Sequence, residues 1–111
     1  MNPAMLVNGE PTDQVAADDR GLQYGDGLFE TMAVVNGRLP LWRFHMERLA
    51  QGCRRLRLPA PDTAGLQAEV EGLAQGVQRA VIKLIISRGP GGRGYRPPAT
   101  HVTCPTTRRW R

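Results

Sequence analysis

The sequence predicts an α+β fold: a two-layer sandwich in which two helices cover one face of an antiparallel sheet. Two Asn-Gly pairs, at residues 8–9 and 36–37, each follow a short apolar run, which is typical of tight β-hairpins. Between residues 41 and 76 the apolar residues recur every three or four positions, the period of helices with one buried face. An apolar run over residues 79–87 then predicts another strand.

The first strands are expected to end at the two Asn-Gly turns. A strand over residues 5–7 enters the first turn, and a strand over residues 28–35 enters the second. Residues 38–41 would return from the second turn as a partner strand. Segments 18–21 and 25–27 are rich in Asp and Gly, which predicts further turns.

Two helices follow. The first extends to about residue 57, where Pro59 and Pro61 end it, and its apolar face consists of Leu41, His45, Leu49, Cys53 and Leu56. The second helix has Asp62 as its N-cap and Gly76 just past its end. Its inner face consists of Leu66, Val70 and Leu73.

A glycine-rich loop follows the last predicted strand. Residues 88–95, Arg-Gly-Pro-Gly-Gly-Arg-Gly-Tyr, combine four glycines with two arginines and a tyrosine, which suits a small anion. Gly89, Gly91 and Gly94 match the dinucleotide fingerprint, but Pro97 and Pro98 prevent the helix that this fingerprint needs. A P-loop lacks its Gly-Lys-Ser/Thr ending. A plain connection between strands is the alternative interpretation.

Composition limits the classes of protein. A chain of 111 residues with 41% hydrophobic residues suits one small globular domain. No apolar run is long enough to span a bilayer and the N-terminus does not resemble a signal peptide, so we expect a cytoplasmic protein without membrane contact. Cys53 and Cys104 have no metal or redox spacing, and Cys53 is expected to be buried and reduced.

The charge is distributed unevenly. The net charge is +5, but residues 72–111 contain seven arginines and one lysine and no acid. A basic half of a chain can bind nucleic acid, an anionic small molecule or an acidic partner protein. Few aromatic residues are interleaved with these charges, which weighs against nucleic acid.

The C-terminal segment breaks the pattern. A strand is expected to start at residues 101–104, but the sequence from Pro105 has no strand pattern. We therefore expect one domain over residues 1–104 and an irregular tail over 105–111. The tail is either an ordinary frayed end or the product of a truncation or a shifted reading frame.

Three motifs occur in a familiar order: Gly25-Asp-Gly-Leu-Phe-Glu-Thr31, His45-x-x-Arg48-Leu49, and Ile86-Ser-Arg-Gly-x-Gly-Gly-Arg-Gly-Tyr95. Together they resemble the fold-type IV pyridoxal-phosphate enzymes, which include D-amino-acid and branched-chain aminotransferases. The third motif is most similar to that of the aminodeoxychorismate lyases. The resemblance covers residues 5–103 and implies the N-terminal domain of such an enzyme.

The resemblance also implies roles for residues. Arg48 would bind the phosphate of pyridoxal 5'-phosphate, although an arginine beside an apolar helix face more often only reaches solvent. Phe29 would face the active site, and Arg93 and Tyr95, rather than Arg88, would bind substrate. Asp26 and Glu30 flank a strand start, which is common and by itself indicates no site. No metal site is expected.

The implied reaction converts 4-amino-4-deoxychorismate to 4-aminobenzoate and pyruvate, in folate biosynthesis, in a homodimer. No catalytic residue is expected in this chain, because the family's Schiff-base lysine lies in a second domain. The only lysine here, Lys83, resembles a structural strand position. We therefore expect the chain alone to be inactive and to bind the cofactor weakly or not at all. A D-amino-acid or branched-chain aminotransferase fragment and a small basic nucleic-acid-binding module are the alternatives.

Overall fold

The computed structural model describes residues 5–91 and the backbone course of residues 104–110. Five strands and three helices occur in these segments: β1 Met5–Val7, β2 Glu10–Pro11, α1 Arg20–Tyr24, β3 Gly27–Val35, α2 Trp42–Arg55, α3 Thr63–Ala74, β4 Arg79–Ser87 and β5 Cys104–Trp110.

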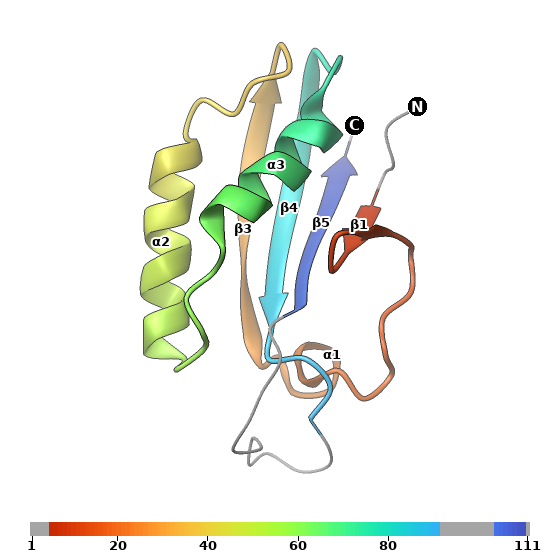
Figure 1. The fold of residues 1–111 in the computed structure, drawn as a ribbon, viewed down its shortest axis with the longest axis vertical. Helices are drawn as coiled ribbons and strands as arrows, with labels where there is room; N and C mark the ends of the chain where they lie inside the picture. Colours follow the sequence, from red (N-terminus) through yellow and green to blue (C-terminus); the bar gives the residue numbers. More distant parts are fainter. Residues whose placement is uncertain (1–4, 92–103, 111) are drawn as a thin grey trace.

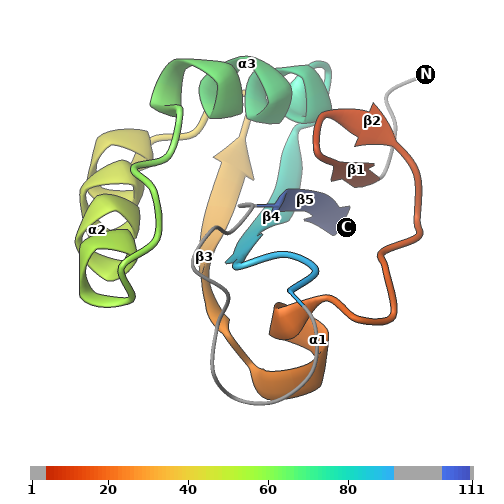
Figure 2. The ribbon, with the colours of Figure 1, turned by 60° about the horizontal axis from the view of Figure 1, so that its bottom comes forward.

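The strands form one antiparallel sheet in the order β2-β1-β5-β4-β3. Helices α2 and α3 cover one face of it, α2 alongside the edge strand β3, and the short helix α1 lies at one end of the sheet (Figure 1). A view from that end shows the same two layers (Figure 2). The predicted fold class, an antiparallel sheet with two helices on one face, is confirmed.

Alternation along β3 and β4 gives the sheet one covered and one open face. Met32 and Val34 of β3 and Ile82, Leu84 and Ile86 of β4 are at most 1% exposed and form the core with the helices. Their neighbours along each strand point to the opposite face because successive side chains alternate. That open face carries exposed apolar residues, including Phe29, Val35 and Val81.

The two Asn-Gly turns have different outcomes. Asn8 and Gly9 join β1 to β2 with positive φ angles of 52° and 80°, so the first predicted hairpin is confirmed. Asn36 and Gly37 also form a tight turn, after which Arg38 makes a single antiparallel bridge with Val35, but no strand follows, so the predicted partner strand over 38–41 is wrong beyond this bridge. The ladder of β3 is instead taken by β4 over its whole length, and the chain enters α2 at Trp42.

The prediction of an irregular tail over 105–111 is wrong for residues 105–110. They belong to β5, which lies between β1 and β4, so the sheet continues past the expected domain end at 104. Thr106 pairs with Ile85 and Thr107 with Leu84. Backbone ladders on both sides stabilise a strand without any apolar alternation, and threonine suits a strand. The strand expected at residues 101–104 is described only from Cys104 onward.

Helix α2 packs through Met46, Leu49 and Cys53. Cys53 is 1% exposed and unpaired, as predicted, and burial raises the pKa of its thiol. Leu41 and Leu56, which were expected on the buried face, are exposed because they lie just outside the two ends of the helix.

Helix α3 has the predicted cap and inner face. The Asp62 carboxylate accepts a hydrogen bond of 3.1 Å from the backbone N–H of Gly65, which satisfies a free donor of the first turn. Leu66, Val70 and Leu73 are buried, also as predicted. Val77 N–H then bonds the Ala74 carbonyl, and Gly76, with φ of 72°, turns the chain toward β4.

Glu69 is a poorly accommodated charge on α3. Its Oε2 atom is buried and has no hydrogen-bond partner among the described residues. Burial, and then the negative charge of Asp62, raise the pKa of the Glu69 carboxyl group. Folding therefore shifts the titration of Glu69 to higher pH.

Replacing Glu69 by glutamine is expected to stabilise the chain at pH 7 by up to about 1 kcal/mol, a value limited by solvent screening. Because folding raises this pKa, the contribution of protonated Glu69 to the stability of the wild type is complete below the unfolded pKa of about 4.3. This contribution is lost as pH rises through the higher folded pKa. The gain from Glu69→Gln should thus be larger at pH 7 than at pH 4. Thermal unfolding at the two pH values tests this, and an equal effect at both would contradict it.

Candidate functional site

Three polar side chains meet between β3 and α2. Glu30 points from β3 toward the helix layer, and its side chain is 7% exposed. Its Oε2 atom lies 2.8 Å from Nδ1 of His45, and its Oε1 atom lies 3.3 Å from Nε of Arg48. His45 and Arg48 come to the same carboxylate because residues three apart share a helix face. The sequence motif His-x-x-Arg is therefore held by a glutamate from the neighbouring strand.

The guanidinium of Arg48 is only partly used by this contact. Its side chain is 73% exposed, and within residues 5–91 its terminal Nη atoms have no hydrogen-bond partner. These two N–H₂ groups are the part of the fork that binds a phosphate or carboxylate. The structure thus leaves Arg48 chemically able to take the anion-binding role that the sequence predicts for it.

Phe29 lies on the other side of β3, because it is the neighbour of Glu30 along the strand. Its side chain is 59% exposed on the open face of the sheet. Nζ of Lys83, on β4, lies 4.5 Å from the centre of the Phe29 ring, a cation–π contact. The two predicted site residues Phe29 and Arg48 thus border the same strand from opposite faces.

A buried ion cluster holds the start of the glycine-rich loop. Nε of Arg20 and Nε of Arg88 both donate to Oδ2 of Asp26, at 2.9 and 2.8 Å. Arg88 also donates to the carbonyls of Leu56 (2.6 Å) and Arg57 (3.5 Å) at the end of α2. Its side chain is 9% exposed, so Arg88 is a structural link between β4, α1 and α2 rather than a free anion ligand.

The charge of Asp26 is fixed by this cluster. Burial by itself would raise the pKa of the Asp26 carboxyl group, but the hydrogen bonds and positive charges of Arg20 and Arg88 lower it below its usual value. Asp26 is therefore ionised at neutral pH. It balances one of the two buried guanidinium charges directly.

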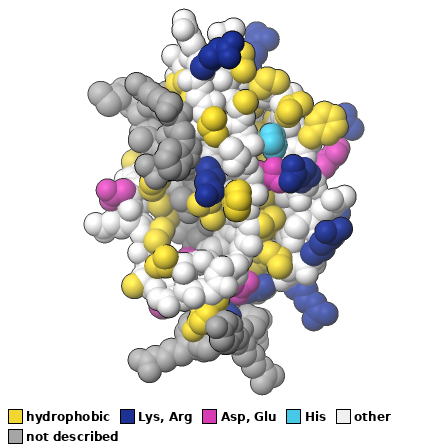
Figure 3. Space-filling model, turned by 180° about the vertical axis from the view of Figure 1, so that it is seen from behind, with side chains coloured by type: hydrophobic (Ala, Val, Ile, Leu, Met, Phe, Trp, Pro, Cys, Tyr) yellow, Lys and Arg dark blue, Asp and Glu magenta, His cyan; other side chains and the backbone are white. Residues whose placement is uncertain are grey.

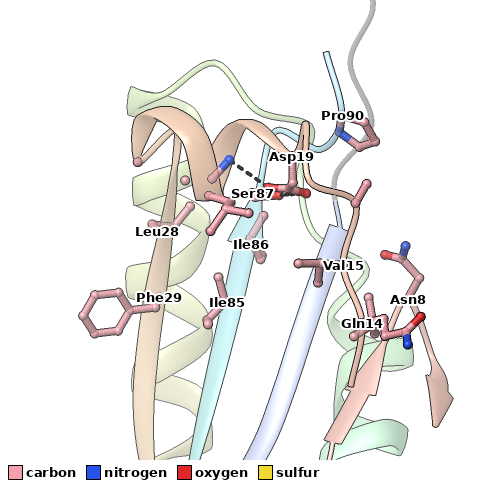
Figure 4. A pocket seen from close by; sticks show the side chains of 16 residues that line it. Asn8, Gln14, Val15, Asp19, Leu28, Phe29, Ile85, Ile86, Ser87 and Pro90 are labelled. Carbon is pink, nitrogen blue, oxygen red and sulfur yellow. Dashed lines mark hydrogen bonds between the residues drawn. The ribbon is translucent and has the colours of Figure 1, made fainter. Parts of the chain in front are cut away.

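A second set of bonds fixes the same end of β4. Asp19 caps α1 by accepting from Gly21 N–H (2.8 Å), and its other oxygen accepts from the Ser87 hydroxyl (3.0 Å). Ser87 Oγ in turn accepts from Gly89 N–H at 3.0 Å. The first residues of the glycine-rich loop are thereby tied to α1 (Figure 4).

A pocket of about 590 Å³ opens beside these bonds on the open face of the sheet. Phe29 lies at one end and Gln14 and Val15 at the other, with Ile85 of β4 between them (Figure 4). Seen from the side opposite to the helices, hydrophobic and basic side chains lie together on the molecular surface (Figure 3). The pocket lining is mostly apolar, so it can accept a ligand with an apolar ring.

Comparison with known proteins decides the family. The family described as amino-transferase class IV matches residues 27–109. The chain belongs to the aminotransferase class IV family. This is a family of pyridoxal-phosphate-dependent lyases and transaminases, and the predicted family resemblance is confirmed.

Several class IV proteins are similar to this chain. An aminodeoxychorismate lyase of Vibrio harveyi is 41% identical over 91 residues, which are 82% of this chain and 34% of that protein. A bifunctional aminodeoxychorismate lyase / D-amino acid transaminase of Mycobacterium tuberculosis is 37% identical over 98 residues, which are 84% and 34% of the two chains. The crystal structure of the 4-amino-4-deoxychorismate lyase of Pseudomonas aeruginosa matches with a TM-score of 0.84 and 45% identity, over 93% and 38% of the two chains. The chain spans about a third of the length of the curated relatives it matches.

The class IV match leaves the roles of individual residues as predictions. Arg48 and Phe29 lie where such roles are chemically possible, whereas Arg93 and Tyr95 lie outside the described residues. Among the helices that the structure describes, none is long and apolar enough to cross a membrane. Within the same segments, no cluster of three or more His, Cys, Asp or Glu residues is placed to hold a metal ion.

Sequence reasoning assigned no functional contact to three residues that the structure places in the contacts described above. Glu30 and Asp26 were treated as ordinary acids near a strand start, and Lys83 as a structural strand residue. A sequence signal existed for Glu30, because it occupies an inward position in a strand that otherwise alternates with apolar residues. No local signal pairs Asp26 with Arg88, which is 62 residues away.

Proposed function

We propose that this chain corresponds to the N-terminal domain of a pyridoxal-phosphate-dependent lyase. The lyase would convert 4-amino-4-deoxychorismate to 4-aminobenzoate and pyruvate, in folate biosynthesis. The observation that carries the proposal is the 45% identity, at a TM-score of 0.84, to the P. aeruginosa lyase. The sequence from Ser87 to Tyr95, which resembles the lyases most closely, supports it further. A homodimer in the cytoplasm is part of the same proposal.

Arg48 is the residue of this chain that would hold the cofactor. Its exposed Nη groups match two phosphate oxygens, while its Nε remains on Glu30. When bound, the cofactor supplies the electron sink for loss of the ring proton and departure of pyruvate. The contribution of Arg48 is to bind and orient the phosphate end.

The open face of the sheet would receive the substrate, which carries a ring and two carboxylates. Phe29 offers an apolar surface to the ring. The ammonium of Lys83, held over Phe29, attracts a carboxylate to the same place. Arg93 and Tyr95 are proposed to add donors from the glycine-rich loop, whose first residues are fixed by Asp19 and Asp26.

Lys83 is the only lysine among the 111 residues, and it lies in the middle of β4 with its Nζ over Phe29. We propose that the lysine that bonds the cofactor is supplied from outside these residues. The purified chain is therefore expected to release no pyruvate from 4-amino-4-deoxychorismate above a cofactor-only control.

The proposed activity is tested in a chimera that carries this chain in place of the matching segment of the P. aeruginosa lyase. We expect the chimera to release pyruvate from 4-amino-4-deoxychorismate. Replacing Arg48 by glutamine in it should weaken cofactor binding about 10- to 100-fold, because charge-assisted hydrogen bonds to the phosphate are lost. Arg43→Gln is the matched control, since Arg43 lies on the same helix and its side chain is 88% exposed.

The outcomes separate the alternatives. A folded, cofactor-loaded chimera that transfers the amino group to a keto acid but releases no pyruvate would identify an aminotransferase instead. The similarity to the bifunctional M. tuberculosis protein makes this the control reaction to measure alongside. Equal cofactor affinity in Arg48→Gln and Arg43→Gln would remove the phosphate role from Arg48.

A further inference from the structure

Glu30 is a carboxylate at a position where the fold otherwise uses apolar side chains. Met32 and Val34, the next inward residues of β3, are each 1% exposed, and Glu30 is 6% exposed. Burying a carboxylate costs free energy unless partners compensate for its lost hydration. The contacts of its two carboxylate oxygens therefore show what compensates for its burial.

Each oxygen of Glu30 has its own partner. Oε2 lies 2.8 Å from His45 Nδ1, and Oε1 lies 3.3 Å from Arg48 Nε. A carboxylate only accepts, so Nδ1 carries the proton in this contact. The contact with His45, whose side chain is 14% exposed, fixes the direction in which Oε1 points.

The contact with Arg48 orients the whole guanidinium. This contact is an ion pair of 3.3 Å, and because the guanidinium is planar and rigid, holding Nε close to Oε1 also restricts where both Nη groups can lie. Glu30 and His45 are buried or nearly so, whereas Arg48 is 73% exposed. The buried end of the cluster is thus the more restrained one, and most of the Arg48 side chain is open to solvent.

We propose that Glu30 is a positioning residue for anion binding by Arg48. Glu30 does not touch the anion; braced by His45, it holds the guanidinium in the orientation that presents both Nη groups to a phosphate. This inference rests on the proposed role of Arg48 in binding the cofactor phosphate.

The sign of the effect distinguishes positioning from simple electrostatics. The negative charge of Glu30 repels an anion at Arg48, so removing the charge alone would tighten anion binding. Loss of orientation acts in the opposite direction, because a free arginine side chain must be ordered when the anion binds. Weaker binding after neutralisation of Glu30 is therefore specific to positioning.

The test titrates the ¹⁵N-labelled 111-residue chain with inorganic phosphate and follows the Nε–H resonance of Arg48 by NMR. Glu30→Gln keeps the shape of the side chain but has one acceptor oxygen for two donors. Glu30→Met removes both acceptors and keeps the position apolar. We expect both variants to bind phosphate at Arg48 about 2- to 10-fold more weakly, and we expect the Nε–H group of Arg48 to become more mobile, as measured by ¹⁵N relaxation.

Glu47→Gln is the matched control. Glu47 is a glutamate of α2; its side chain is 58% exposed and pairs with Arg43. Its neutralisation should leave phosphate binding at Arg48 unchanged or slightly tighter. The backbone amide spectrum shows whether each variant keeps the fold. If Glu30→Met does not fold, the isosteric Glu30→Gln variant decides the result.

Two different failures can be told apart. If wild-type Arg48 responds to phosphate and the folded Glu30 variants bind it equally well or more tightly, the positioning role is wrong and the role of Arg48 stands. If wild-type Arg48 shows no phosphate response, its proposed phosphate role is contradicted, and this inference is overturned with it.

Discussion

Replacing Asp26 by asparagine is expected to lower the free energy of unfolding by about 3–5 kcal/mol. The side chains of Arg20 and Arg88 are 2% and 9% exposed, and both donate to the same oxygen of Asp26. An asparagine side chain removes the negative charge that the two buried guanidinium groups share. Urea unfolding of the wild type and the variant measures the difference.

Glu47→Gln is again the appropriate control, because the Arg43–Glu47 pair is exposed and of the weak i,i+4 type. Its loss should cost at most about 0.5 kcal/mol. A cost for Asp26→Asn as small as that of this control would show that the cluster contributes nothing to stability.

The cluster of Asp26, Arg20 and Arg88 also predicts that the chain loses stability at low pH. The pKa of Asp26 is lowered in the folded chain, so its contribution is present above the unfolded pKa of about 3.9 and is lost as pH falls through the lower folded value. Stability of the wild type should therefore fall more steeply below pH 4 than that of Asp26→Asn. Parallel curves for the two proteins in this range would contradict the assignment.

Replacing Gly27 by alanine is expected to destabilise the chain by at least about 1–3 kcal/mol. A Cβ atom at Gly27 would overlap the carbonyl oxygen of Ile86 and lie 3.0 Å from Cα of Ser87. Both obstacles are backbone atoms of the paired strand β4, so relief requires the strands to separate next to the Asp19–Ser87 bond. Thermal unfolding and the amide exchange of Ser87 report the two effects.

Gly72→Ala is the control for the chemistry of the substitution. Nothing lies within 4 Å of a Cβ atom at Gly72 in α3, and alanine is the better helix former. This variant should be more stable than the wild type by about 0.5–1 kcal/mol. Equal effects at Gly27 and Gly72 would mean that the close approach of β3 and β4 is not as tight as described.

Local sequence patterns predicted the elements that are determined locally. Helices α2 and α3 follow from the apolar period and from Asp62 as a cap, and the first hairpin follows from Asn8-Gly9. The second Asn-Gly turn was interpreted as the start of a second hairpin because it repeats the Val-Asn-Gly sequence of the first. Only β4, more than 40 residues later, decides which strand pairs with β3 along its length. Strand β5 was missed for a related reason, since its stability comes from two flanking strands rather than from its own pattern.

The candidate site likewise contains residues that a local motif predicts and residues that depend on contacts between distant segments. The motif around His45 predicted a phosphate-binding role for Arg48 through the family resemblance, and this role stays a prediction. Its partner Glu30 and the contact between Lys83 and Phe29 depend on strand alternation and on the register of β3 with β4, in which Thr31 pairs with Lys83. Register across distant segments has no signature in a single sequence.

The position of β5 also constrains the order in which the chain can fold. Within the sheet, the N-terminal hairpin of β1 and β2 meets the other strands only through β5, which is the latest strand in the described sequence. As the chain leaves the ribosome, β3, α2, α3 and β4 can associate early, whereas the hairpin must wait for residues 104–110. Closing the sheet thus joins segments about a hundred residues apart, and such non-local steps are slow. A nascent chain would expose the unpaired edges of β1 and β4 until that moment, which is when binding of a chaperone would matter most.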